Sequence, residues 1–131
     1  MNKDIKIIKT TLIFIYLALL VLIALPCHAE DKIEIRCIMG EARGETLIGM
    51  TAIGEAIRNR GHLRGVYGCK AKFTEPRWVW KIARQAWLNS YSSNLTKGAT
   101  HWESTDFPIP YWVKAMDITV IIGKHVFYKE K

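Results

Sequence analysis

Apolar residues recur at helical spacing in the first part of the chain beyond residue 32. The spacing predicts a short helix over 33–39 and a second helix that follows the capping residue Thr46 and runs to about Arg60. Pro76 opens a third helix, because proline suits the first turn of a helix. The second helix leaves little polar surface and is therefore expected to be central. Its apolar residues are Ile48, Ala52, Ile53, Ala56 and Ile57.

The period of the pattern changes after Gly98. Residues 100–104 form a short aromatic stretch, and 106–110 form a turn. Residues 116–122 alternate in a way that predicts a half-buried strand, and a glycine turn leads back into 125–128. Helices followed by a small C-terminal antiparallel sheet make an α+β domain. The residues expected on one side of the strand are Met116, Ile118, Val120 and Ile122.

The N-terminus has the three parts of a secretory signal. Lysines precede an uninterrupted apolar run over 12–25, and Ala29 closes the segment before an acidic pair. The run is shorter than the roughly 20 residues that cross a bilayer comfortably. We therefore expect residues 1–29 to be a secretory signal peptide, and residues 30–131 to be the single domain of a protein exported to the periplasm, the cell wall or the medium. The alternative is an uncleaved leader that anchors the protein in a membrane.

The segment that follows the predicted signal is basic. The chain has 19 Lys and Arg against 12 Asp and Glu, and three Lys and one Asp lie within 1–29, which leaves a net charge of +5 on 30–131. A basic domain rich in tryptophan suits an anionic polymer such as a bacterial wall. Nucleic acid is the rival partner for this charge. Export and the lack of any nucleic-acid-binding motif argue against it.

Two cysteines remain beyond the signal, Cys37 and Cys69. In an oxidising compartment, two cysteines of a small domain pair more often than not, so we expect a disulfide. Closing a loop of about 30 residues is worth about 3 kcal/mol in the chain-entropy model. Two buried free thiols are the alternative. Neither the cysteines nor the histidines have the spacing of metal ligands, so no metal and no cofactor is expected.

The segment 40–45, Gly-Glu-Ala-Arg-Gly-Glu, places the carboxyl of Glu41 between an apolar run and a glycine break. Such a carboxyl can be partly desolvated, keep its proton near neutral pH and donate that proton to a leaving group. The pattern by itself is ambiguous, because two glutamates four residues apart are typical of a solvated helix face.

Several short pieces of the chain match a known family in order and span essentially all of residues 33–128. Through them the chain resembles the SleB-like cell-wall hydrolases, the catalytic-domain type of spore-cortex-lytic enzymes. Two features depart from the family's pattern. The two cysteines are not part of that pattern, and the loop after Arg60 is shorter and more basic than is usual in the family. The matching pieces are Glu41 to Glu45, Gly49, Ala52, Asn59-Arg60, Gly65-Val66, Phe73, Gly98-Ala99, Trp112 and Gly123 to Phe127.

The resemblance implies a small lysozyme-like α+β domain that cleaves the glycan strands of peptidoglycan with one essential glutamate, Glu41. In a lytic transglycosylase, one glutamate protonates the glycosidic oxygen and then takes the proton of the muramoyl C6 hydroxyl, which closes a 1,6-anhydro ring. A muramidase-type hydrolase is the other option. A binding-only or inactive wall module is the alternative function. Peptidoglycan is the expected partner, and the protein is expected to act as a monomer.

Four further carboxylates could assist Glu41, and each has a structural interpretation beside the catalytic one. Glu45 is interpreted as an acid at the start of a helix, and Asp106 as a turn residue. Glu55 is interpreted as a buried group that pairs with Arg58 or Asn59. Glu103 is the most open case, because it follows Trp102 on a segment that should border the cleft in the family's fold.

Sugar binding requires aromatic faces and polar side chains. The polar neighbours of Trp102 favour a cleft position for this ring, and Glu103, Tyr111 and Trp112 are the other candidates. His125 precedes a strand and is interpreted as a packed structural histidine. The remaining tryptophans lie on the third helix and are expected in the core or at its rim. They are Trp78, Trp80 and Trp87.

Overall fold

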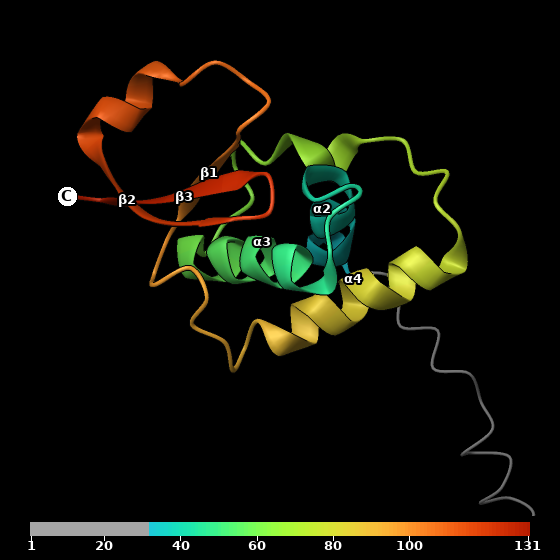
Figure 1. Ribbon diagram of the computed structural model, residues 1–131. Helices are drawn as coiled ribbons and strands as arrows, with labels where there is room; N and C mark the ends of the chain where they lie inside the picture. The colour runs from blue at the N-terminus through green and yellow to red at the C-terminus, as the bar shows by residue number, and fades with distance from the viewer. Residues whose placement is uncertain (1–31) are drawn as a thin grey trace, which may run out of the picture. The chain divides into compact units, whose positions relative to one another are not determined.

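The computed structural model describes residues 32–131, so the signal peptide predicted over 1–29 lies outside the described residues. Helices come first and a small antiparallel sheet comes last, which confirms the expected small α+β domain (Figure 1). Within 32–131, no helix is long and apolar enough to cross a membrane. The elements are α2 (Ile33–Glu41), α3 (Leu47–Arg60), η1 (Tyr67–Lys70), α4 (Arg77–Asn89), β1 (His101–Ser104), η2 (Tyr111–Ala115), β2 (Met116–Ile122) and β3 (His125–Glu130).

Helix α3 is the central element, as predicted. The Thr46 side chain caps its start by accepting a hydrogen bond from the Gly49 N–H at 3.3 Å. Gly61 ends the helix in the left-handed conformation at φ 74°, where a side chain would be strained. Every residue from Gly49 to Ile57 is buried, and Figure 1 shows α3 between the sheet and α4.

The core lies where α2, α3 and α4 meet, and Phe127 of β3 closes it. Burying a large apolar side chain completely contributes about 1.5–3 kcal/mol, so this cluster is the main source of stability. Two tryptophans of α4 lie in the core or at its rim, as predicted: Trp87 is buried, and Trp80 packs against the core and edge-on against Phe73. The prediction is wrong for Trp78, which is 63 % exposed and does not pack against the core, because it lies on the solvent side of the first turn of α4. The largest fully buried apolar side chains are Ile38, Met39, Met50, Ile53 and Phe127.

The sheet has the strand order β1-β3-β2, and both pairs are antiparallel. The predicted alternation of β2 is wrong at its centre, because the register shifts between Ile118 and Val120. This bulge puts Ile118 and Val120 on opposite faces, and it moves Ile121 to the side of Ile118. Ile118 and Ile121 are each 62 % exposed, whereas Val120 packs against the core.

Glu55 is a buried carboxylate whose partners differ from the expected ones. Its Oε2 accepts hydrogen bonds from the Ser93 hydroxyl and the Leu95 N–H, and its Oε1 accepts two from Thr96. The loop after α4 therefore wraps a carboxylate of α3, and neither Arg58 nor Asn59 pairs with it. Burial opposes ionisation, but these hydrogen bonds outweigh it and hold the pKa of Glu55 below its usual value.

The lowered pKa of Glu55 gives the stability a predictable acid dependence. Its contribution is fully present above the ordinary carboxyl pKa of about 4.3, and it is lost as the pH falls through the lower folded-state value. We expect Glu55→Gln to cost about 1–3 kcal/mol at neutral pH and to lose less further stability in acid than the parent protein does. Thermal unfolding of both proteins at neutral and acid pH measures this. Equal acid losses would assign the pH dependence to other carboxylates.

Candidate active site

A cleft of about 360 Å³ opens between the end of α2, the loop that carries η1, and β1. β1 is an edge strand, and residues from both of its faces line the cleft. The volume falls within the range of small-ligand and sugar-sized sites. The lining residues are Gly40, Glu41, Arg60, Gly65, Tyr67, His101, Trp102, Glu103, Ser104, Phe107, Trp112 and His125.

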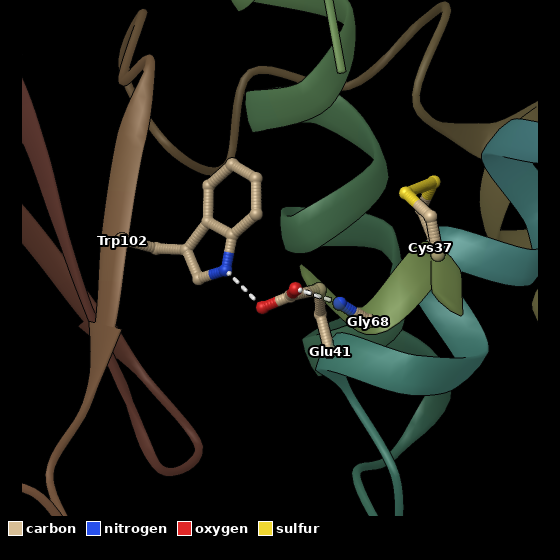
Figure 2. The surroundings of a disulfide bond; sticks show 5 residues. Cys37, Glu41, Gly68 and Trp102 are labelled. Atoms are coloured by element: carbon tan, nitrogen blue, oxygen red, sulfur yellow. Dashed lines mark hydrogen bonds between the residues drawn. A yellow bond between two sulfur atoms is a disulfide. The ribbon is translucent and has the colours of Figure 1, made fainter. Parts of the chain in front are cut away.

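Glu41 is the last residue of α2, which extends two residues beyond the predicted helix 33–39, and both of its carboxylate oxygens accept hydrogen bonds (Figure 2). Oε1 accepts a hydrogen bond from the Gly68 N–H at 2.6 Å, and Oε2 accepts one from the Trp102 indole N–H at 3.1 Å. The donors come from η1 and β1, so the two walls of the cleft meet at this carboxylate. Each oxygen keeps a further lone pair. Glu41 can therefore exchange a proton with a bound ligand without losing its orientation.

The approach of η1 to Glu41 requires glycine on both sides. A Cβ on Gly40 would lie 2.0 Å from the Gly68 carbonyl oxygen, and a Cβ on Gly68 would lie 2.5 Å from the Glu41 nitrogen. Both neighbours are backbone atoms, which cannot swing aside. The expected disulfide is present, joining Cys37 of α2 to Cys69 of η1 immediately beside this contact. Small residues and a covalent link therefore keep the Gly68 N–H against the carboxylate.

We expect Gly68→Ala to destabilise the protein by about 2–3 kcal/mol, because overpacking against backbone forces the two segments apart. Gly98→Ala is the matched control: a Cβ there meets nothing within 4 Å, and only the positive φ of 82° opposes it. Its cost should be about 1–2 kcal/mol. Chemical denaturation of both variants measures the difference. A Gly68→Ala protein as stable as its parent would show that this contact is loose.

The predicted sugar-binding residues divide into those that line the cleft and one that does not. Trp102 lies in the cleft and donates to Glu41. Trp112 packs edge-on against Tyr128 and also lines the cleft, as does Glu103, whose Oε1 accepts from the Ser104 N–H at 3.1 Å. Tyr111 is 88 % exposed and is not among the lining residues.

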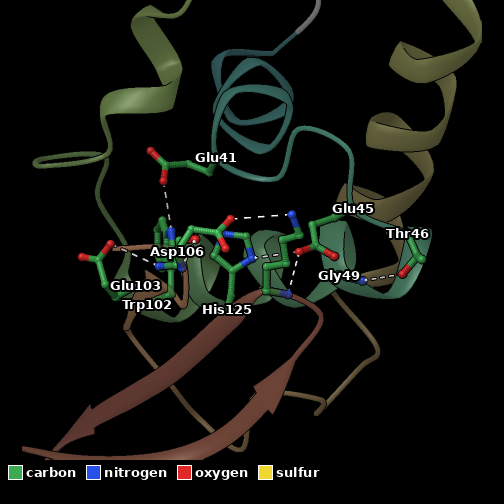
Figure 3. A network of polar contacts seen from close by, with 10 residues as sticks. Glu41, Glu45, Thr46, Gly49, Trp102, Glu103, Asp106 and His125 are labelled. Atoms are coloured by element: carbon green, nitrogen blue, oxygen red, sulfur yellow. Dashed lines mark hydrogen bonds and ion pairs between the residues drawn. The ribbon is translucent and has the colours of Figure 1, made fainter. Parts of the chain in front are cut away.

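The other carboxylates near the cleft are engaged in structural contacts (Figure 3). Glu45 accepts a hydrogen bond from the Lys124 N–H at 2.8 Å and lies 3.4 Å from Nδ1 of the buried His125. It thus fastens the β2–β3 turn to the segment that follows α2. Asp106 forms an exposed ion pair with the Lys124 ammonium group at 3.6 Å. Glu45 and Asp106 therefore have structural partners, but those of Glu45 lie in the β2–β3 hairpin and not at the start of its own helix as expected. His125 is buried, as predicted, and it also lines the cleft.

Two basic residues in the cleft had been given no role from the sequence. Burial lowers the pKa of Arg60, and the charge of Glu41 partly offsets this. Arginine nevertheless stays protonated. Burial and then the charge of Arg60 lower the pKa of His101, and the opposing charge of Glu130 does not cancel this. Arg60 belongs to one of the short segments through which the chain resembles the family, and nothing else in the sequence marked it as a cleft residue. His101 entered the sequence analysis only as one of the polar neighbours of Trp102.

No group of three or more His, Cys, Asp or Glu side chains within 32–131 gathers as a metal site would require.

No protein-family model and no curated protein matches the chain. Two solved structures do. The catalytic domain of the Bacillus cereus SleB protein superposes with a TM-score of 0.56 and 22% identity, over 79% of this chain and 94% of that one. The catalytic domain of the germination-specific lytic transglycosylase SleB from Bacillus anthracis gives 0.55 and 22%, over 79% and 98%. At this identity the likeness establishes the fold.

Proposed function

We propose that this protein, which has the fold of SleB catalytic domains, cleaves the glycan strands of peptidoglycan with Glu41 as its acid and base. The observation that carries the proposal is the position of Glu41, which lies in the cleft and is held through both oxygens. The protein named as a lytic transglycosylase among the two structural neighbours supports the same class of reaction.

The reaction begins with a proton on Glu41, which passes to the glycosidic oxygen as the bond to the muramoyl carbon breaks. The Gly68 N–H and the Trp102 indole N–H then stabilise the carboxylate that remains. Glu41 next takes the proton of the muramoyl C6 hydroxyl, whose oxygen closes the 1,6-anhydro ring. The proton balance is complete, because the same carboxylate gives one proton and receives another.

The contacts of the other carboxylates favour this single-glutamate route over hydrolysis. A two-carboxylate glycosidase needs a second group free to attack the sugar or to activate water. Glu45 and Glu55 are committed to backbone donors, and Asp106 pairs with Lys124. Glu103 is the other carboxylate that lines the cleft, and it is the residue on which a hydrolytic reaction would depend.

The setting of the proposed reaction follows from its substrate. Peptidoglycan lies outside the cytoplasmic membrane, so the protein acts after export, in the periplasm or at the wall. The experiment is to add purified protein to a suspension of peptidoglycan and to measure the turbidity of the suspension over time. Clearing is the expected result. Binding to the sediment without clearing would instead favour a wall-binding module.

A further inference from the structure

A second hollow of about 330 Å³ adjoins the cleft, beyond Arg60 and His101. These two residues line both spaces, so a ligand in the cleft lies next to the second hollow. It forms where the end of α3 meets the residues before β1 and the end of β3. Its lining residues are Arg60, His62, Gly98, Thr100, His101, Lys129 and Glu130, and we call this space the side hollow.

The side hollow is electropositive. Its lining includes two cations, Arg60 and Lys129, against the single carboxylate of Glu130, and two histidines that can take part in hydrogen bonds. Burial and the positive charge of Arg60 lower the pKa of His101, and the charge of Glu130 only partly opposes them. A concave surface with an excess of one charge attracts ligands of the opposite charge. The ligand that fits is therefore an anion with hydrogen-bond acceptors, such as a carboxylate.

We propose that the side hollow binds the carboxylates of the peptide stem that the muramoyl sugar carries, beside the bond that Glu41 cleaves. The inference rests on the proposed function, and it adds a preference for glycan that still bears its stems. Two lining residues are common to both spaces, so the anion must be attached close to the reacting sugar. The stem meets this condition, because it branches from that sugar and ends in free carboxylates.

Lys129 is the residue by which the proposal can be tested without disturbing Glu41. It is exposed near the end of β3, and it lines the side hollow but not the cleft. Its ammonium group can meet a carboxylate in water-exposed surroundings, where the effect of one charge is modest. Reversal to Lys129→Glu places two carboxylates in the hollow together with Glu130. His62→Ala removes a second side chain that belongs to the side hollow alone.

The experiment measures kcat and KM on soluble glycan fragments with their stems and on the same fragments after the stems are removed. Lys129→Glu should raise KM about three- to tenfold on the stem-bearing substrate, with kcat unchanged and no change on stripped glycan. His62→Ala should shift KM in the same direction. The control is Lys81→Glu, the same charge reversal at an exposed position of α4 outside both spaces. It should leave the ratio of the KM values on the two substrates unchanged.

Separate outcomes overturn the two proposals. If Lys129→Glu changes KM equally on both substrates, or on neither, the stem site is refuted. Cleavage by the parent protein would still support the proposed function in that case. If the parent cleaves neither substrate, the function fails, and titration of the protein with free stem peptide then decides the site. Weaker binding of that peptide to the Lys129→Glu protein than to the parent supports the site. Equal binding, or no binding, rejects it.

Discussion

Replacing Glu41 with Gln is expected to lower the rate of peptidoglycan cleavage by about 10²–10⁴-fold, the usual contribution of a general acid–base group. The amide keeps the size of the side chain, and its oxygen can still accept one hydrogen bond from Gly68 or Trp102. It can neither give a proton to the glycosidic oxygen nor take one from the C6 hydroxyl. The loss should therefore appear in kcat, while binding to peptidoglycan stays close to that of the parent.

Glu34→Gln is the matched control for this substitution. Glu34 lies in the first turn of the same helix, is also partly buried and does not line the cleft. The rates of cleavage by the two variants, with circular dichroism to verify folding, make the comparison. Full activity of Glu41→Gln would refute the site assignment. An equal loss in both variants would mean that α2 tolerates neither change and that the effect is structural.

Removal of the Cys37–Cys69 disulfide should have the largest effect on stability. The bond joins residues 32 apart in the sequence, and a loop of that size contributes about 3–4 kcal/mol in the chain-entropy model. Replacing both cysteines with Ser should lower the free energy of unfolding by that amount. Activity should fall as well, because Cys69 follows Gly68, whose N–H holds Glu41.

Two measurements separate these effects. Urea denaturation of the parent under oxidising and reducing conditions gives the contribution of the bond without mutation, and the double-Ser variant should match the reduced parent. Thiol titration of the denatured, unreduced protein should find no free thiol on Cys37 or Cys69. An unchanged urea midpoint on reduction would show that packing at Gly40 and Gly68 alone fixes η1.

The sequence predicted those elements that depend on neighbours along the chain. Thr46 caps α3 and Pro76 precedes α4, and both were identified because capping chemistry operates within one helical turn. The bulge in β2 was missed. It depends on how Thr119 fits between two strand registers, and an alternating run of apolar residues contains no sign of it.

The site was predicted unevenly for the same physical reason. The segment 40–45 identified Glu41 as a candidate acid, but its two hydrogen-bond donors are 27 and 61 residues away, and only the tertiary fold brings them there. Glu55 was given neighbours from its own helix as partners. Its actual donors lie in the loop 93–96. A buried carboxylate needs several hydrogen-bond donors, and these can come from any part of the chain that the fold brings close.

The cleft residues Arg60 and His101 show a second limit of pattern reading. An alternating pattern assigns His101 and Trp102 to opposite faces of a strand. β1 is a four-residue edge strand, however, and the cleft reaches both of its faces. A short edge strand can therefore contribute consecutive residues to one site.

Mass spectrometry of peptidoglycan digested by the parent protein and by Glu41→Gln tests the central claim most directly. The account predicts that the parent releases muropeptides lighter by one water, with 1,6-anhydro ends, and that Glu41→Gln releases almost none. Muropeptides with reducing ends alone would make the protein a hydrolase and direct attention to Glu103. Intact glycan strands after digestion by the parent would contradict the proposed function itself.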